Sequence, residues 1–295
     1  MAVELLQSPD MPPTDPDQAM GLALMAQQRN KRTIQMIKIG IVWLGLLIFL
    51  GIMLLLLDFD PLYVLEHFPF VLKGLRLTIE ISVISIAIAT VLALLGAIGR
   101  LSNNALAQGI SGFYVSLFRG TPLLIQIFII YSGLPQIGKT LINMGESHPI
   151  LGDIGQLFVL TGVQSGILAL SLNYGAYMTE IFRAGIQSIS HGQREAAESI
   201  GMTRWQIMRR VTLPQAIRVI IPDIGNQFIA MQKDSAQVSV MGIWEMTYRA
   251  SRLARQESKF MEMFVVAAGF YWLLTFVSSW LEGLLERKMA HAYER

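Results

Sequence analysis

The chain has 295 residues, of which 53% are hydrophobic and only 15% are charged. Soluble proteins usually contain about 25% charged residues, so much of this protein's surface is predicted to face lipid. The formal net charge of +2 is too balanced for a nucleic-acid-binding protein. The absence of cysteine excludes disulfides, thiolate metal sites and thiol catalysis.

About six segments are predicted to span a membrane, because about 20 mainly apolar residues cross the hydrocarbon core. The first, 39–57, has no charged residue, and it starts too late and is too long for a cleavable signal peptide. Residues 1–30 before it contain Pro9, Pro12, Pro13 and Pro16 and are expected to form a loose tail with at most one short helix. The other predicted spans are 75–99, 113–133, 157–183, 215–240 and 262–284. The span at 215–240 is interrupted by charges and a proline, so a hydropathy scan alone would miss it.

The orientation follows from the loops between these spans. Lys and Arg are more frequent in the loops that share a side with the N-terminus, and such loops are usually cytoplasmic. Both termini and the loop at 184–214 are therefore predicted to lie in the cytoplasm.

The cytoplasmic loop is predicted to contain a first short helix. Ser190 and Gln193 have the spacing of a capping box, in which two side chains satisfy the free amides at a helix start. The helix can run to Ile200, because Gly201 stands where a left-handed residue commonly ends a helix.

A second short helix is predicted directly after this turn. Thr203 and Gln206 match another capping box, and Pro214 is expected to interrupt the helix that follows. Ala196 and Ala197 make the first helix thin enough to enter a groove on a partner. The loop is thus predicted to be a pair of helices at an angle, although an ordinary cytoplasmic hairpin is an alternative.

The same loop resembles the EAA motif of bacterial ABC importer permeases, EAA-x3-G-x9-I-x-LP, with Val211 in place of isoleucine. The resemblance implies that the matching residues couple the permease to its ATPase; they are Glu195, Ala196, Ala197, Gly201, Leu213 and Pro214. Residues 118–123 and 175–183 are similar to the branch of the family that imports polar amino acids. The resemblance covers roughly 72–285, within which the outer loop at 134–156 is longer than usual.

The resemblance implies an all-α membrane protein with the type I, methionine-importer-like permease fold. Its function would be that of a permease subunit of an ATP-driven importer of polar amino acids, working by alternating access in the bacterial inner membrane. The implied partners are an ATP-binding cassette ATPase dimer, a second permease subunit (the same chain or a homologue), an extracytoplasmic amino-acid-binding protein and membrane lipid. ATP and Mg would be bound by the ATPase subunits, and this chain would hold no cofactor and catalyse no reaction.

The resulting domain organisation has four parts. They are a cytoplasmic tail at 1–38, an additional span at 39–57, a transmembrane domain at 72–285 with coupling helices at 190–213, and a cytoplasmic tail at 286–295.

Polar side chains inside the fourth and fifth predicted spans suggest a translocation path, since each ionised group there costs roughly 2.5–3.5 kcal/mol. The candidate path residues are Asn173, Tyr177, Glu180, Asn226, Gln227, Lys233 and Asp234. Glu180 and Asp234 would accept from a substrate ammonium group, whereas Lys233 and Asn226 would donate to its carboxylate. The alternative is that these groups pair with one another and hold helices together; Glu180 and Arg183 are close enough in sequence to do so.

Two further stretches carry short sequence patterns, one for a helix kink and one for phosphate binding. Residues 119–122 read Arg-Gly-Thr-Pro within the third span and predict a kink. Residues 133–140 match the phosphate-binding pattern GxxxxGK[ST], but they follow a membrane span rather than a strand, so we do not expect nucleotide binding there.

Other functions find less support in the sequence. The 4 histidines are scattered without metal-ligand spacing, and no catalytic motif is present. A secondary carrier or channel driven by an ion gradient would explain the buried charges equally well. It would not explain the motif at 190–214.

Overall fold

The computed structural model describes residues 16–56, 59–145 and 148–291, and this part of the chain contains helices and no strand. The chain divides into two compact units, Met1–Asp60 and Pro61–Arg295. Each unit is described separately below.

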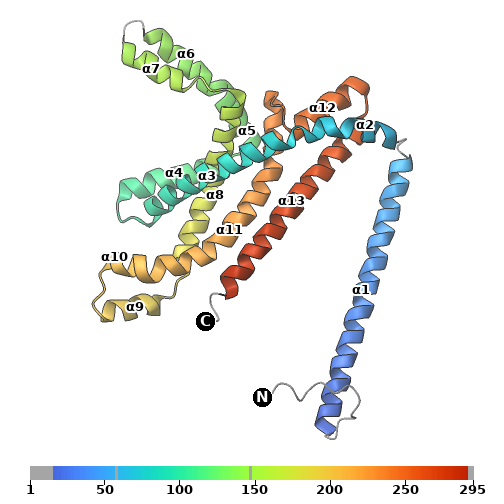
Figure 1. Ribbon diagram of the computed structural model, residues 1–295. Helices are drawn as coiled ribbons and strands as arrows, with labels where there is room; N and C mark the ends of the chain where they lie inside the picture. The colour runs from blue at the N-terminus through green and yellow to red at the C-terminus, as the bar shows by residue number, and fades with distance from the viewer. Residues whose placement is uncertain (1–15, 57–58, 146–147, 292–295) are drawn as a thin grey trace. The chain divides into compact units, whose positions relative to one another are not determined.

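The described part of the first unit is one helix, α1, which runs from Pro16 to Leu56 (Figure 1). Residues 16–30 are therefore helical, so the loose tail predicted for 1–30 is wrong over this part. Proline is tolerated at the first position of a helix, where its missing amide would have no partner. Within α1, residues Gln27–Met53 are long and apolar enough to cross a membrane.

The second unit contains the remaining helices. The α-helices are α2 (Pro61–Leu72), α3 (Leu75–Leu101), α4 (Ala105–Gly120), α5 (Leu123–Phe128), α6 (Leu134–Met144), α7 (Pro149–Leu157), α8 (Gly162–Gln187), α9 (His191–Ser199), α10 (Arg204–Ile207), α11 (Leu213–Asp234), α12 (Met246–Glu257) and α13 (Phe260–His291). Two π-helical turns, η1 (Ile129–Gly133) and η2 (Met208–Thr212), and a 3₁₀ segment, η3 (Ser235–Met241), complete it. Figure 1 shows α9 and α10 at one end of this unit and α2 and α12 at the other.

The core of the second unit lies between α3 and α8. Buried small residues line α3, including Ala89, Ala93 and Gly96. A Cβ on Gly96 would collide with the Thr179 side chain of α8, and small residues allow such close approach of helices in membranes. The α3–α8 pair is therefore the closely packed frame of this core, and α2, α12 and α13 form a second, smaller hydrophobic cluster.

Helix length and composition support three to five membrane spans in the described residues. α1, α3 and α13 qualify as single helices, and the bent pairs α4 with α5–α6 and α7 with α8 qualify if each pair counts as one span. The predicted number of about six is larger, because α11 does not qualify. This helix carries Arg218, Asp223 and Lys233, the kind of interruption that hydropathy was expected to miss. Whether α11 crosses the membrane stays a prediction.

The kink predicted at 119–122 is confirmed and is sharp. α4 ends at Gly120, and the helices on either side of Thr121 and Pro122 are bent by 108°. The Gln126 side chain closes the bend, since its Nε2 donates to the backbone oxygens of Phe118 (2.8 Å) and Thr121 (3.0 Å). The carbonyls that the break leaves without helical partners are thereby satisfied.

The long loop at 134–156 is a helical hairpin of α6 and α7, which projects from the helices around it in Figure 1. Its helices are in backbone contact, because a Cβ on Gly155 would lie 2.6 Å from the carbonyl oxygen of Gly138. The phosphate-binding pattern at 133–140 falls within η1 and helix α6, so it forms no phosphate loop.

Replacing Gly155 with alanine should loosen this hairpin by about 1–2 kcal/mol, because the added methyl group forces the two helices apart. Amide hydrogen exchange over Leu134–Met144 and Pro149–Leu157 should become faster by roughly tenfold. Gly133→Ala is the control, since its Cβ would meet no atom closer than 3.9 Å. Equal exchange in the two variants would contradict the close packing.

The N-terminus of α12 is capped by the buried carboxylate of Glu245. The Glu245 side chain accepts from the backbone amides of Tyr248 (2.6 Å) and Thr247 (2.8 Å) and from the hydroxyl of Tyr271 (2.8 Å). Burial raises the pKa of the Glu245 carboxyl above its ordinary value. The carboxyl thus caps α12 and links it to α13.

Candidate functional site

The predicted pair of cytoplasmic helices is formed by α9 and α10 (Figure 1). Gly201 lies between them with a φ of 82°, the left-handed conformation that was predicted to end the first helix. The second capping box is also confirmed: Gln206 Oε1 accepts from the Thr203 amide at 2.8 Å. The first is wrong, because the Ser190 side chain makes no capping bond. Instead, Arg194 Nη2 donates to the Ile186 carbonyl of α8 at 2.6 Å and ties α9 to that helix.

The second helix does not end at Pro214, contrary to prediction. α10 continues through the π turn η2 directly into α11, and Pro214 lies in the first turn of α11. The wider hydrogen-bonding pattern of a π turn accommodates a residue without an amide better than a regular helix does. The hairpin and α11 are therefore one continuous helical piece.

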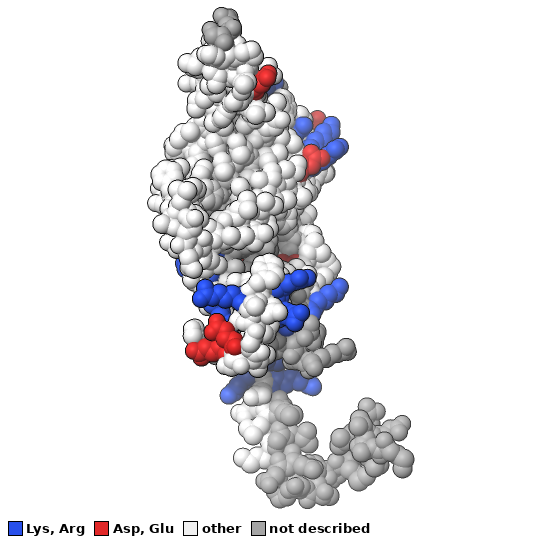
Figure 2. All heavy atoms as spheres, turned by 90° about the vertical axis from the view of Figure 1, so that its left-hand side faces the viewer, with Lys and Arg blue, Asp and Glu red and all other residues white. Residues whose placement is uncertain are grey.

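The motif residues lie mostly on the surface of this hairpin. Ala197 is buried, whereas Glu195, Ala196 and Pro214 are exposed and Leu213 is 37% exposed. The Glu195 carboxylate pairs with His191 at 3.0 Å, an exposed contact. Figure 2 faces this side of the molecule and shows many of its charged atoms in the lower half of the view, below a wide uncharged surface, with smaller charged groups at the upper right.

Two large apolar side chains stand next to the motif. Ile200 is 79% exposed and Trp205 is 71% exposed. Exposed apolar groups with a charged border are typical of a protein-binding surface. The hairpin thus has the composition of a docking element.

A groove of about 490 Å³ lies between α4, α8 and α11. It contains three of the predicted path residues, Tyr177, Glu180 and Gln227, together with Arg119 and Asp223. The structure therefore brings polar groups of the predicted fourth and fifth spans to one surface.

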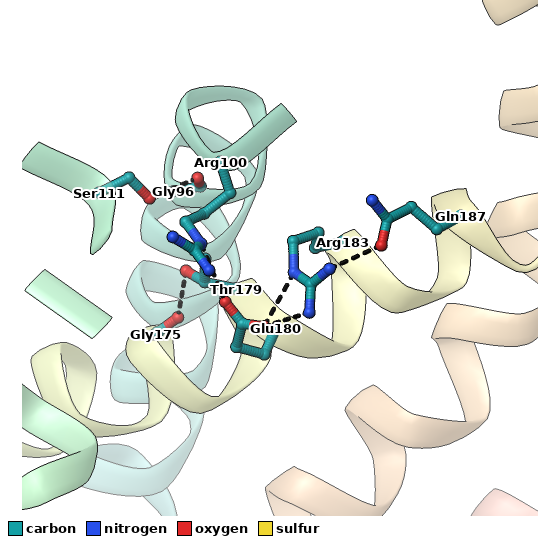
Figure 3. A network of polar contacts seen from close by, with 8 residues as sticks. All are labelled: Gly96, Arg100, Ser111, Gly175, Thr179, Glu180, Arg183 and Gln187. Atoms are coloured by element: carbon teal, nitrogen blue, oxygen red, sulfur yellow. Dashed lines mark hydrogen bonds and ion pairs between the residues drawn. The ribbon is translucent and has the colours of Figure 1, made fainter. Parts of the chain in front are cut away.

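Glu180 is the centre of a charge network at the edge of this groove (Figure 3). Its carboxylate pairs with Arg183 on the next turn (2.7 Å) and with Arg100 at the end of α3 (3.2 Å). Arg183 also donates to Gln187 at 2.6 Å. The pairing of Glu180 with Arg183 was foreseen as the alternative to a substrate role, whereas Arg100 was not, because it lies 80 positions away in the sequence.

The other predicted path residues do not line the groove. Asn173 is buried and donates to Gln126 Oε1 at 3.0 Å, so it supports the α4–α5 bend. Asp234 accepts from the Tyr174 hydroxyl at 2.7 Å. Asn226 donates to the Pro222 carbonyl at 3.4 Å on its own helix, and the Lys233 side chain is exposed.

The groove also holds two charged residues outside the predicted set. The Arg119 guanidinium lies over the Tyr177 ring, 5.2 Å from its centre. Asp223 enters the groove from α11 and is exposed. Two features of the sequence could have indicated these residues. The predicted kink directly follows Arg119, and Asp223 stands four positions before the predicted path residue Gln227, about one helical turn away.

Long apolar helices with buried polar groups, a polar groove and an exposed helical hairpin are the features expected of a membrane transport subunit. The family model of binding-protein-dependent transport system inner membrane components matches residues 85–291. The chain therefore belongs to this family and is the permease component of an ABC importer, a transport subunit without an ATPase domain.

Curated relatives agree with this assignment. The chain is 34% identical to the probable amino-acid permease protein YxeN of Bacillus subtilis (strain 168) over 231 residues, 78% of this chain and 96% of that protein. It is 34% identical to the arginine transport system permease protein ArtQ of the same strain over 233 residues, 79% and 97% of the two chains. It is 36% identical to the octopine transport system permease protein OccM of Rhizobium meliloti over 230 residues, 78% and 90% of the two chains.

Solved structures confirm the fold. A crystal structure of an amino acid ABC transporter with histidines matches with a TM-score of 0.68 at 34% identity, over 78% of this chain and 98% of that chain. An inward-facing structure of the MetNI methionine ABC transporter matches with a TM-score of 0.58 at 17% identity, over 76% and 98%. The predicted methionine-importer-like, all-α permease fold is therefore correct.

Proposed function

We propose that the chain forms the translocation path of an ATP-driven importer of polar amino acids and is driven through the α9–α10 hairpin. The relatives named for arginine and octopine transport support the substrate class. The observation that carries the proposal is the attachment of the hairpin to both walls of the groove. It continues into α11 through η2, and Arg194 ties it to the end of α8.

This attachment supplies a mechanism. A partner ATPase that binds ATP and Mg would dock on the exposed residues of the hairpin and displace it. Because the hairpin and α11 are continuous, α11 would move relative to the α3–α8 frame and open the groove to one side at a time, as alternating access requires. The docking surface would be formed by the exposed motif residues, which are Glu195, Ala196, Gly201, Leu213 and Pro214.

The family implies an ATPase and a binding protein as partners and the inner membrane as the location. We further propose a second permease subunit, an ATPase dimer, and cytoplasmic positions for both termini and the hairpin. The tail at 1–38 and the span at 39–57 precede the family match, which starts at 85. They are proposed to be additions to the transmembrane domain of 72–285.

The proposal is tested by substitutions at Gly201, which forms the turn between α9 and α10. Gly201→Val should lower ATP-dependent uptake about tenfold, because a β-branched residue at positive φ costs roughly 1–2 kcal/mol and changes the angle between α9 and α10. Uptake of labelled amino acids would be measured in proteoliposomes that contain the permease, its ATPase and the binding protein. Gly201→Asn should retain most of the activity, because asparagine tolerates this conformation.

The matched control is Gly192→Ala in α9. Its Cβ would meet no atom closer than 3.8 Å, and its φ is not positive, so uptake should stay at the wild-type level. Wild-type uptake by Gly201→Val, or uptake by the permease alone in an ion gradient, would contradict ATPase coupling through this hairpin. The second result would favour the secondary carrier.

A further inference from the structure

The groove between α4, α8 and α11 contains two charges of opposite sign that the fold does not use. Arg119 contacts the Tyr177 ring, and within residues 16–56, 59–145 and 148–291 neither Arg119 nor Asp223 forms an ion pair or a side-chain hydrogen bond. Glu180 in the same groove is different, because Arg100 and Arg183 already hold its carboxylate.

Uncommitted charges at this place need an explanation. Both residues lie in predicted spans, 113–133 and 215–240, where an ionised side chain costs roughly 2.5–3.5 kcal/mol and usually marks a substrate or ion pathway. They line one groove from different helices, α4 and α11. The groove volume of about 490 Å³ lies in the range of small-molecule sites, roughly 300–1,000 Å³.

We propose that Arg119 and Asp223 bind the two charged groups that every amino acid shares. Arg119 receives the α-carboxylate, and Asp223 receives the α-ammonium group. The inference rests on the proposed function and specifies how the groove recognises its substrate.

The chemistry of each residue suits this division. A guanidinium group donates parallel N–H bonds to a carboxylate and keeps them available when its face lies on an aromatic ring, as that of Arg119 does on Tyr177. An aspartate carboxylate only accepts hydrogen bonds, so it suits an ammonium group. Gln227 lies in the same groove and offers both a donor and an acceptor to a polar substrate side chain.

This assignment replaces the one based on sequence. Glu180 and Asp234 were expected to accept from the ammonium group. The Glu180 carboxylate already pairs with Arg100 and Arg183, and Asp234 accepts from the Tyr174 hydroxyl and does not line the groove. Lys233 and Asn226 were expected to bind the carboxylate, and neither lines the groove.

The experiment measures binding directly to the permease. The permease–ATPase complex is purified in lipid nanodiscs without the binding protein, so that the selectivity of that protein does not mask the groove. Labelled standard L-amino acids identify the ligand, which is then compared with its decarboxylated amine and its deaminated acid; for L-arginine these are agmatine and δ-guanidinovalerate. The wild-type complex should bind each analogue about 10- to 100-fold more weakly than the amino acid.

Each variant should lose the ability to recognise one of the two charged groups of the amino acid. Arg119→Gln should bind the amino acid no better than the amine, and Asp223→Asn should bind it no better than the acid. Arg218→Gln and Asp153→Asn, which change exposed charges outside the groove, should keep the wild-type preference for both groups.

The proposal would be overturned if Arg119→Gln and Asp223→Asn still bound the amino acid more tightly than the amine and the acid, to the same degree as the wild-type complex. If binding to the nanodisc complex is too weak to measure, the Michaelis constant for ATP-dependent uptake is measured instead. A Michaelis constant that differs from the wild-type value by less than about twofold in both variants would also overturn the proposal. ATP-dependent uptake by the wild-type complex would in either case leave the proposed function intact, so the two failures are distinguishable.

Discussion

Gly74→Ala should destabilise the permease by about 3 kcal/mol, the upper end of the range for overpacking. Gly74 lies between α2 and α3, where a Cβ would be 2.5 Å from the amide nitrogen of Met246 and 2.6 Å from the carbonyl carbon of Glu245. Both atoms belong to the backbone that starts α12, so no side chain can move aside. The methyl group would therefore separate α3 from the start of α12 and weaken the buried cap at Glu245.

Thermal unfolding of the purified protein in detergent, followed by circular dichroism, would measure the loss. Gly109→Ala is the control, because it adds a methyl group in α4 with no atom within 4 Å. This change should leave stability unchanged or raise it slightly, since alanine favours a helix by up to about 1 kcal/mol over glycine. Equal unfolding temperatures for Gly74→Ala and the wild-type protein would show that α12 is not held as described.

Glu180→Gln should cost about 2 kcal/mol of stability. The Glu180 side chain is 17% exposed and its two arginine partners are 35% and 31% exposed, so the change leaves two partly buried guanidinium groups without a counter-charge. Breaking a fully buried ion pair costs roughly 3–5 kcal/mol, whereas exposed pairs contribute at most about 1 kcal/mol. A value between these limits is expected for this network.

Glu80→Gln provides the comparison for this prediction. It breaks the ion pair with Arg76 on α3, in which the side chains are 46% and 87% exposed. Chemical denaturation of both variants under the same conditions should show a clear loss for Glu180→Gln and almost none for Glu80→Gln. Similar losses would mean that the Arg100–Glu180–Arg183 network does not join α3 to α8.

Local features of the fold could be predicted from the sequence. The left-handed turn at Gly201, the cap at Thr203 and the break after Gly120 depend on residues within four or five positions of one another, and all three are present. The family motif at 195–214 added the function, because the resemblance identified a permease that the local helix signals alone do not identify.

Long-range partners could not be predicted in this way. The spacing of Asn173, Tyr177 and Glu180 is that of residues on one face of a helix, but it carries no information on which other helix meets that face. Arg100 reaches Glu180 across 80 positions, and Tyr174 reaches Asp234 across 60. Two candidate substrate contacts, Glu180 and Asp234, therefore have partners within the chain that the sequence did not indicate.

The π turn at Met208–Thr212 has a geometric consequence for this permease. A π turn contains one residue more than the α-helical turn it replaces, which shifts the angular phase of everything after it by about 100°. The side chains of α10 that are proposed to face the ATPase and those of α11 that are proposed to line the groove are thus offset around a single helical axis. Deleting one residue from this turn would rotate one set relative to the other by about 100° while leaving the composition of both unchanged.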